Sequence, residues 1–154
     1  MIEVDDKEVM AMFAEMDKKN RKRVLSSALR KSSTILVRQT RQNLRNVTTK
    51  SGTLQTRTPN RWNGKKMEQG IKVKVKVDDK TKEAKIHLLG DFRLKFFEMG
   101  TRERYTKRGK GSYRGNIEGY GFFKSAKEQT EKKIFSEMDQ VFSNEVKRVN
   151  DKYR

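Results

Sequence analysis

The sequence predicts an α+β fold, with a short and a long helix, a three-stranded antiparallel meander, and a long C-terminal helix packed on the sheet. Apolar residues recur at helical spacing over 18–45 and 122–150. Between these segments, over 70–77, apolar and charged residues alternate as in a strand with one buried face. A chain of 154 residues suits one domain, so we expect a single domain over 1–154.

The helical segments are amphipathic. A short helix is predicted over 6–16, where Val9 and Phe13 lie at helical spacing. The long helix over 18–45 has an apolar stripe on one side and arginines and lysines on the other. The stripe of the last helix, over 122–150, makes it the expected packing partner of the long helix or of the sheet.

Three strands are predicted in the middle of the chain. The segment GIKVKVKV at 70–77 and the segment EAKIHLL at 83–89 form a hairpin with one apolar and one basic face. The segment FRLKFFEMGT at 92–101 also alternates, and Gly100 can take the positive φ of a sharp turn that ends it. We therefore expect 92–101 to supply the third strand.

Two polar segments are predicted to be mobile loops, over 46–67 and 102–121. Trp62, in the first loop, is expected to anchor the loop on its own protein or else to stack on a base. The second loop is rich in Gly, Tyr and basic residues. Such a composition is typical of single-stranded nucleic-acid binding or of an assembly segment that orders on contact, and we favour the second reading.

The net charge of +18 is unevenly distributed. Residues 1–17 hold six acids and one Lys, whereas residues 18–67 hold fifteen Lys or Arg and no acid. A solvated basic face is one explanation, and a polyanion or an acidic protein surface as partner is the other. The candidate polyanion contacts are Arg23, Arg30, Lys31, Arg38, Arg41, Arg45, Arg104, Lys107, Arg108, Lys110 and Arg114.

Residues suited to catalysis are few. The chain has no Cys, and its one histidine, His87, falls on the polar face of a predicted strand among lysines. Asp79 with Glu83 and Lys85 resembles a metal-dependent nuclease core, but the acids are expected at the tip of a hairpin rather than converging on a metal ion. We expect no enzyme activity, no catalytic residue, no metal and no cofactor.

The remaining composition suggests a protein completed by its neighbours. Apolar residues make up only 32% of the chain, so the core is thin and a second subunit is expected to cover part of the apolar surface. No basic-then-apolar signal segment opens the sequence, and no apolar run approaches the ~20 residues of a membrane span. A protein made in the cytoplasm without membrane contact is expected.

Two short motifs resemble a known family. The segment Leu94 to Thr101 contains Glu98, Gly100 and Thr101 in the pattern E-x-G-T, and a later segment has Phe122, Phe123 and Ala126 at the start of the last helix. This order is similar to that in the tail-component proteins (also called tail-completion or neck proteins) of long-tailed bacteriophages, the family named after coliphage HK-ninety-seven. Gly121 or Phe122 stands where that family has a proline.

The resemblance implies a non-enzymatic structural protein of a phage or prophage. It implies assembly with copies of itself, as a ring, at the head–tail junction or tail end of the virion, beside other head-connector or tail proteins. The motif residues are then structural, and the positive charge fits contact with DNA. The alternative class is a basic nucleic-acid-binding module, whose binding falls steeply with salt. For Glu98 we expect a hydrogen bond from the backbone of the Gly100–Thr101 turn or an ion pair with an arginine.

Overall fold

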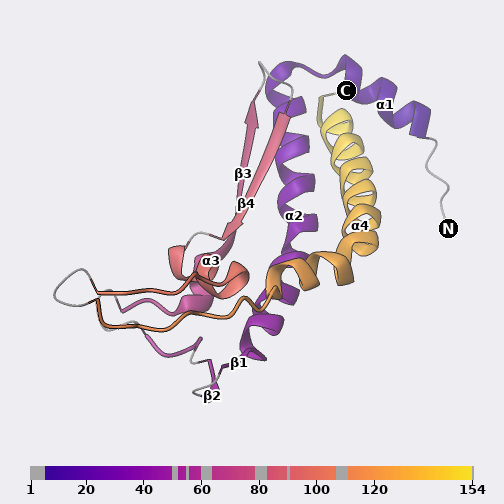
Figure 1. Ribbon diagram of the computed structural model, residues 1–154. Coiled ribbons are helices and arrows are strands. Elements are labelled where there is room, and N and C mark those ends of the chain that lie inside the picture. Colours follow the sequence, from indigo (N-terminus) through magenta and orange to yellow (C-terminus); the bar gives the residue numbers. More distant parts are fainter. Residues whose placement is uncertain are drawn as a thin grey trace. The chain divides into compact units, whose positions relative to one another are not determined.

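A computed structural model shows a chain of mixed helix and strand (Figure 1). The residues that it describes are 6–49, 52–54, 56–59, 64–78, 83–89, 91–106 and 111–153.

The predicted helices are confirmed. They are α1 (Asp6–Glu15), α2 (Lys18–Arg45) and α4 (Phe122–Tyr153). The Asp17 carboxylate accepts a hydrogen bond of 2.7 Å from the backbone N–H of Asn20, which caps the first turn of α2 and separates it from α1.

The strands form two separate two-stranded sheets. In the first, β1 (Thr48–Thr49) pairs antiparallel with β2 (Gly52–Thr53). In the second, β3 (Ile71–Asp78) neighbours β4 (Glu83–Leu89), which confirms the predicted hairpin (Figure 1). Along β3 the lysines are exposed while Ile71 is buried and the valines are half-buried, as the alternation predicted.

The predicted third strand is wrong, and so is the three-stranded meander. Residues Phe92–Met99 form a helix, α3. The Asp91 carboxylate accepts from the backbone N–H of Arg93 at its start, and the Gly100 N–H donates to the Phe96 carbonyl at its end. Eight residues are too few for apolar spacing to separate period 2 from period 3.6, and the two capping residues decide the outcome.

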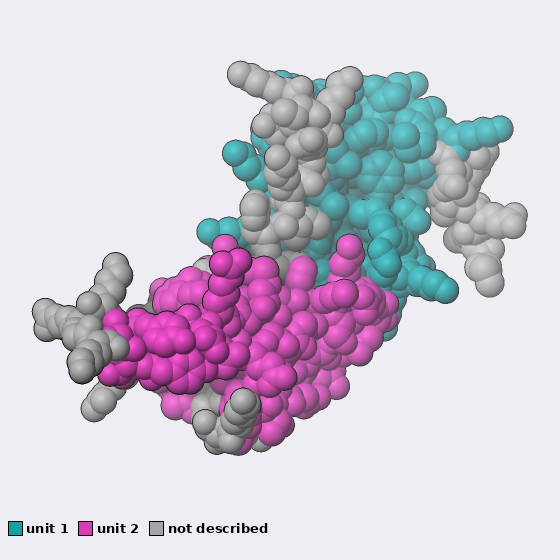
Figure 2. Space-filling model, in the orientation of Figure 1, with its two compact units in different colours: residues 1–36, 73–87, 131–154 teal, residues 37–72, 88–130 magenta. Residues whose placement is uncertain are grey.

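The chain divides into two compact units (Figure 2). Unit 1 comprises residues 1–36, 73–87 and 131–154, and unit 2 comprises residues 37–72 and 88–130. Because α2, the β3–β4 hairpin and α4 each contribute residues to both units, no single cut in the sequence would separate them.

Unit 1 has a small core formed by its helices. Val9 of α1, Val24 of α2, and Val146 and Val149 of α4 are buried together. Phe13 and Phe142 pack at the edge of this cluster with their ring centroids 5.1 Å apart. Burial of its apolar face holds α1, a ten-residue helix that is too short to be stable alone.

Unit 2 buries side chains from four elements. Its buried residues include Leu44 of α2, Ile71 of β3, Leu94 of α3, and Phe122 and Ala126 of α4. Within this unit the short 3₁₀ helix η1 (Met67–Gly70) lies against α3, and an added Cβ at Gly70 would come within 2.5 Å of the Asp91 Cβ. The two motif segments that carry the family resemblance both lie in unit 2.

Candidate functional site

The two motif segments meet at the start of α4. The Glu98 carboxylate at the end of α3 accepts two backbone hydrogen bonds, from Phe123 N to Oε2 at 2.7 Å and from Lys124 N to Oε1 at 2.9 Å. The first backbone N–H groups of a helix have no partner within the helix, and they carry a partial positive charge. Glu98 therefore caps α4 from another element, and we call this contact the Glu98 joint.

The Glu98 joint supplies what the local sequence of α4 lacks. The residue before the helix is Gly121, which has no side chain, and the first turn contains no acid. Gly121 has φ of +56°, a conformation open to glycine, and its carbonyl accepts from the Ser125 N–H. The glycine thus turns the chain into the helix while Glu98 provides the cap that Ser, Thr or Asp usually provides.

Backbone hydrogen bonds hold the two segments together beside the carboxylate. Tyr120 N donates to the Phe97 carbonyl at 2.8 Å, and Gly121 N donates to the Glu98 carbonyl at 3.1 Å. Thr101 takes part twice, because its N–H donates to the Ile117 carbonyl and its hydroxyl accepts from the Ile117 N–H. The prediction that the Gly100–Thr101 turn donates to the Glu98 carboxylate is therefore wrong, since the two N–H groups donate to the Phe96 and Ile117 carbonyls.

Gly100 is required where the two segments cross. Its φ is +78°, and a Cβ there would lie 2.9 Å from both Gly119 N and the Ile117 carbonyl oxygen. A Cβ on Gly119 would lie 2.7 Å from the Met99 carbonyl carbon. Contacts below 3.0 Å between a Cβ and backbone atoms force the backbone to move, so both positions need glycine. No signal in the sequence distinguishes Gly119, because the residue against which it lies, Gly100, is distant along the chain.

The aromatic half of the motif anchors the start of α4. Phe122 and Ala126 are buried, whereas Phe123 is half-buried. The Asn43 amide of α2 donates to the Phe122 carbonyl at 3.2 Å and to Gln129 Oε1 at 3.3 Å. Motif residues are thus divided between a cap, a close backbone crossing and core packing, and all of these roles are structural.

Three of the predicted polyanion contacts on α2 have partners within the protein. Lys31 Nζ lies 2.6 Å from Glu145 Oε1, Arg41 Nη2 donates to the Ile71 carbonyl, and Arg45 Nε lies 2.8 Å from Glu68 Oε2. The hydrogen bond from Arg45 lowers the pKa of the Glu68 carboxyl, against an opposing effect of burial. These three side chains therefore bind carboxylate or carbonyl oxygens of the protein itself.

The other predicted contacts are exposed where the structure describes them. Arg23, Arg30 and Arg38 of α2 are exposed. Arg104 and Arg114 are exposed on the segment between α3 and α4, while Lys107, Arg108 and Lys110 lie outside the described residues.

The predicted loops contain ordered hydrogen bonds. In 102–121, Arg114 N donates to the Arg104 carbonyl at 2.7 Å and Thr106 N to the Ser112 carbonyl at 3.0 Å. In 46–67, Val47 and Thr56 are buried. The mobility of these segments stays a prediction.

Candidate chemistry elsewhere is limited. The Asp79 and Trp62 positions and the side chains of Glu83, Lys85 and His87 lie outside what the structure describes. Across the described ranges, His, Asp and Glu side chains form no group of three that could hold a metal ion. The helices described are also too short or too polar to cross a membrane.

A cavity of about 570 Å³ in unit 2 is lined by residues that include Leu54, Phe97, Ile117 and Glu118.

Comparison of the chain with protein-family models, with curated proteins and with solved structures found no match.

Proposed function

We propose that the protein is a non-enzymatic structural component of a phage or prophage virion. In this proposal it assembles with copies of itself, as a ring, at the head–tail junction or tail end. It is made in the bacterial cytoplasm and contacts other head-connector or tail proteins. The α+β class, with the apolar face of the β3–β4 hairpin covered by helix, is part of the proposal.

The observation that carries the proposal is the Glu98 joint. The E-x-G-T segment and the Phe-Phe-x-x-Ala segment suggested the family from sequence, although twenty residues separate them. In the structure Glu98 of the first segment caps the helix that the second segment opens, at 2.7 and 2.9 Å. Because the two segments form one structural unit, we treat them as parts of one family motif. The roles of their residues are structural, which favours a scaffold over an enzyme.

An exposed apolar stripe supports self-assembly. Along α3, Phe92 is 68% exposed, Phe96 42% and Met99 75%, and these positions follow the helical spacing i, i+4, i+7. The Phe92 and Phe96 rings pack edge to face on each other at 5.9 Å. Aromatic and methionine side chains on one exposed face are typical of an interface that a neighbouring subunit covers.

The test is the mass of the particle in solution. Light scattering at increasing protein concentration, followed by negative-stain microscopy, should show closed rings of several copies. A protein that stays monomeric at high concentration, alone and with tail-tube or head-connector proteins, would disprove the proposal. Neighbouring genes for capsid, portal and tail tube are expected as well.

A matched pair of variants locates the interface. The double variant Phe92→Ser, Met99→Ser should reduce the particle mass and leave the thermal unfolding temperature of the dilute, monomeric protein unchanged, because both side chains are exposed. The variant Phe135→Ser removes a 55% exposed aromatic side chain from α4 and should leave the particle mass unchanged. Equal loss of assembly in both would show that the α3 stripe is not the interface.

A further inference from the structure

The segment between α3 and α4 contains a two-stranded ribbon, residues 101–106 and 111–117. Its two sides are joined by backbone hydrogen bonds from Thr101 N to the Ile117 carbonyl, Arg114 N to the Arg104 carbonyl and Thr106 N to the Ser112 carbonyl. Tyr105 and Tyr113 face each other as an antiparallel bridge. Figure 1 shows the two sides running next to each other, away from α3. The base of the ribbon is held by Thr101 and by the close crossing at Gly100.

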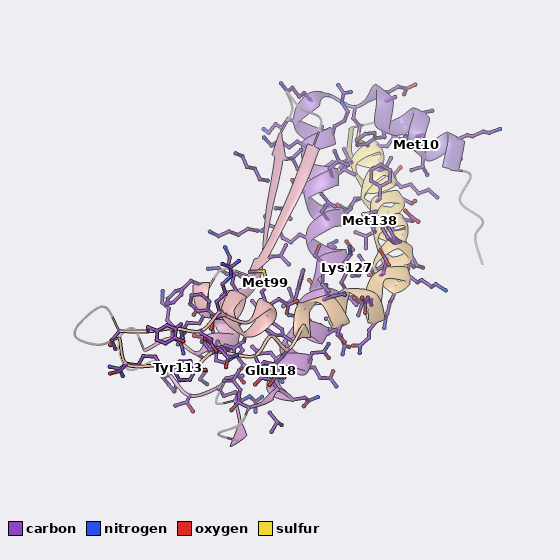
Figure 3. All side chains as sticks on the ribbon, viewed as in Figure 1. Met10, Met99, Tyr113, Glu118, Lys127 and Met138 are labelled. Carbon is purple, nitrogen blue, oxygen red and sulfur yellow. The ribbon has the colours of Figure 1, made fainter. Side chains whose placement is uncertain are left out.

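One face of the ribbon is aromatic. Tyr105 is 58% exposed and Tyr113 56% exposed, and their ring centroids are 5.5 Å apart (Tyr113 is labelled in Figure 3). Directly paired residues lie on the same face of a ribbon, so the two rings form one patch. Tyrosine rings offer a broad, rigid surface on which a flat partner can stack.

The other face is basic. Because side chains alternate along an extended strand, Arg104 and Arg114 lie on the face opposite the tyrosines. Arg104 stays at the ribbon edge, where its guanidinium contacts the Gly115 and Arg114 carbonyls at 3.4 and 3.5 Å. Glu103, the only acid in 102–114, shares the face of the tyrosines, and it accepts a hydrogen bond from the Tyr105 hydroxyl at 2.9 Å.

The charge of this ribbon indicates its partner. Residues 102–114 hold six Lys or Arg and one acid, and the whole chain has a net charge of +18. The same ribbon of a second copy would be repelled, whereas a polyanion would be attracted. Of the polyanions, nucleic acid also offers flat bases for the tyrosines.

We propose that the ribbon binds single-stranded nucleic acid. The phosphates follow the ribbon edge where the Arg104 guanidinium lies, with Arg114 on the adjoining basic face, and unpaired bases turn over that edge onto the Tyr105–Tyr113 patch. Bases in a duplex are stacked on each other and cannot stack on tyrosine without unpairing, so a single strand is preferred. This binding goes beyond the proposed assembly role and can be present or absent independently of it.

The test is a titration of the full chain against a fluorescently labelled 20-nucleotide thymidine strand and a duplex of the same length. Fluorescence anisotropy should show tighter binding to the single strand, with affinity falling steeply as salt rises. Equal affinity for strand and duplex, or no binding at low salt, would overturn the proposal.

Variants separate stacking from charge. The double variant Tyr105→Leu, Tyr113→Leu should weaken binding to the single strand by roughly tenfold or more and leave duplex binding unchanged. The double variant Tyr105→Phe, Tyr113→Phe keeps both rings and should bind as the wild type does. This control distinguishes stacking from the hydrogen bond between Tyr105 and Glu103, and wild-type affinity in the leucine variant would contradict the proposal.

A charge-matched pair tests the arginines. One double variant, Arg104→Gln with Arg114→Gln, removes two exposed positive charges from the ribbon. The other, Arg23→Gln with Arg30→Gln, removes two exposed positive charges from α2. The slope of log affinity against log salt should fall by about 1.4 in the ribbon variant and hardly in the α2 variant. Equal changes in both would mean that only the overall charge matters. A ribbon variant that loses particle mass but binds the strand normally would assign the ribbon to assembly instead.

Discussion

Two carboxylates hold α4 in place, one in each unit, and they do so in different ways. In unit 1, Glu145 is 4% exposed and lies 2.6 Å from both Lys31 Nζ and Arg148 Nη2. In unit 2, Glu98 is half-buried and accepts from the backbone N–H groups of Phe123 and Lys124. One carboxylate is satisfied by flexible cationic side chains and the other by the end of a helix.

The difference determines how each contact depends on the rest of the structure. Lysine and arginine reach Glu145 with long side chains, so modest shifts of either helix can be absorbed. The N–H groups that meet Glu98 are rigid parts of α4, and the carboxylate reaches them only if the chain crosses at Gly100 and Gly119 as it does. The Glu98 joint should therefore be the more sensitive of the two to small changes nearby.

The largest effect is expected for Gly100→Ala. It should lower the free energy of unfolding by about 3 kcal/mol, since a side chain there is strained at φ +78° and meets backbone atoms of Gly119 and Ile117 at 2.9 Å. Urea denaturation measures the change. Gly115→Ala is the matched control, because Gly115 has φ of +74° but an added Cβ there would meet no atom within 4 Å, and it should cost only about 1 kcal/mol. Equal costs would mean that the close crossing is unimportant.

The next largest effect is expected for Glu98→Ala. Removing the cap of α4 should cost about 2 kcal/mol, and hydrogen exchange at the Phe123 and Lys124 amides should accelerate. Glu118→Ala removes an exposed acid from the neighbouring segment and should cost almost nothing. Unchanged exchange at the two amides in Glu98→Ala would disprove the capping role.

A smaller effect is expected for Glu145→Gln, about 1.5 kcal/mol at neutral pH, because the amide loses the charge in its bonds to Lys31 and Arg148. The hydrogen bond from Lys31 lowers the pKa of the Glu145 carboxyl below its usual 4.5, with a further bond from Ser27, while burial opposes the shift. The folded protein thus holds this carboxylate charged more firmly than the unfolded chain does.

The pH dependence follows from the direction of that shift. The stabilisation by Glu145 is fully present above pH 4.5, the usual pKa, and it is lost as the pH falls through the lower pKa of the folded state. The difference in unfolding free energy between wild type and Glu145→Gln should therefore narrow on acidification. A difference that stays constant from pH 7 to pH 3 would contradict this assignment.

The smallest effect is expected for Lys31→Gln, about 0.5 kcal/mol, since the Lys31 side chain is 58% exposed and Arg148 still neutralises Glu145. Thermal unfolding at low and high salt measures it. The loss should shrink at high salt, whereas that of Glu98→Ala should change less, because the Glu98 partners are backbone groups. A larger loss of unfolding free energy for Lys31→Gln than for Glu98→Ala would show that the Glu145 contact is the more important of the two.

The sequence was sufficient wherever a long regular pattern repeats. The helices α2 and α4 and the β3–β4 hairpin follow from apolar spacing sustained over many residues. It was insufficient over Phe92–Met99, where eight residues fit a strand and a helix equally and the Asp91 cap decides for helix. The sequence predicted the exposed basic face of α2, but it did not predict that Lys31, Arg41 and Arg45 bind oxygens of the protein itself.

The sequence by itself indicated that Glu98, Gly100 and Thr101 form a motif and that α4 begins near Phe122. Only the tertiary structure decided that Glu98 is the cap of α4 and that Gly119 lies against Gly100. The physical reason is range. Spacing and capping signals act between residues a few positions apart, whereas the Glu98 joint spans 25 residues and exists only once the chain has folded back on itself.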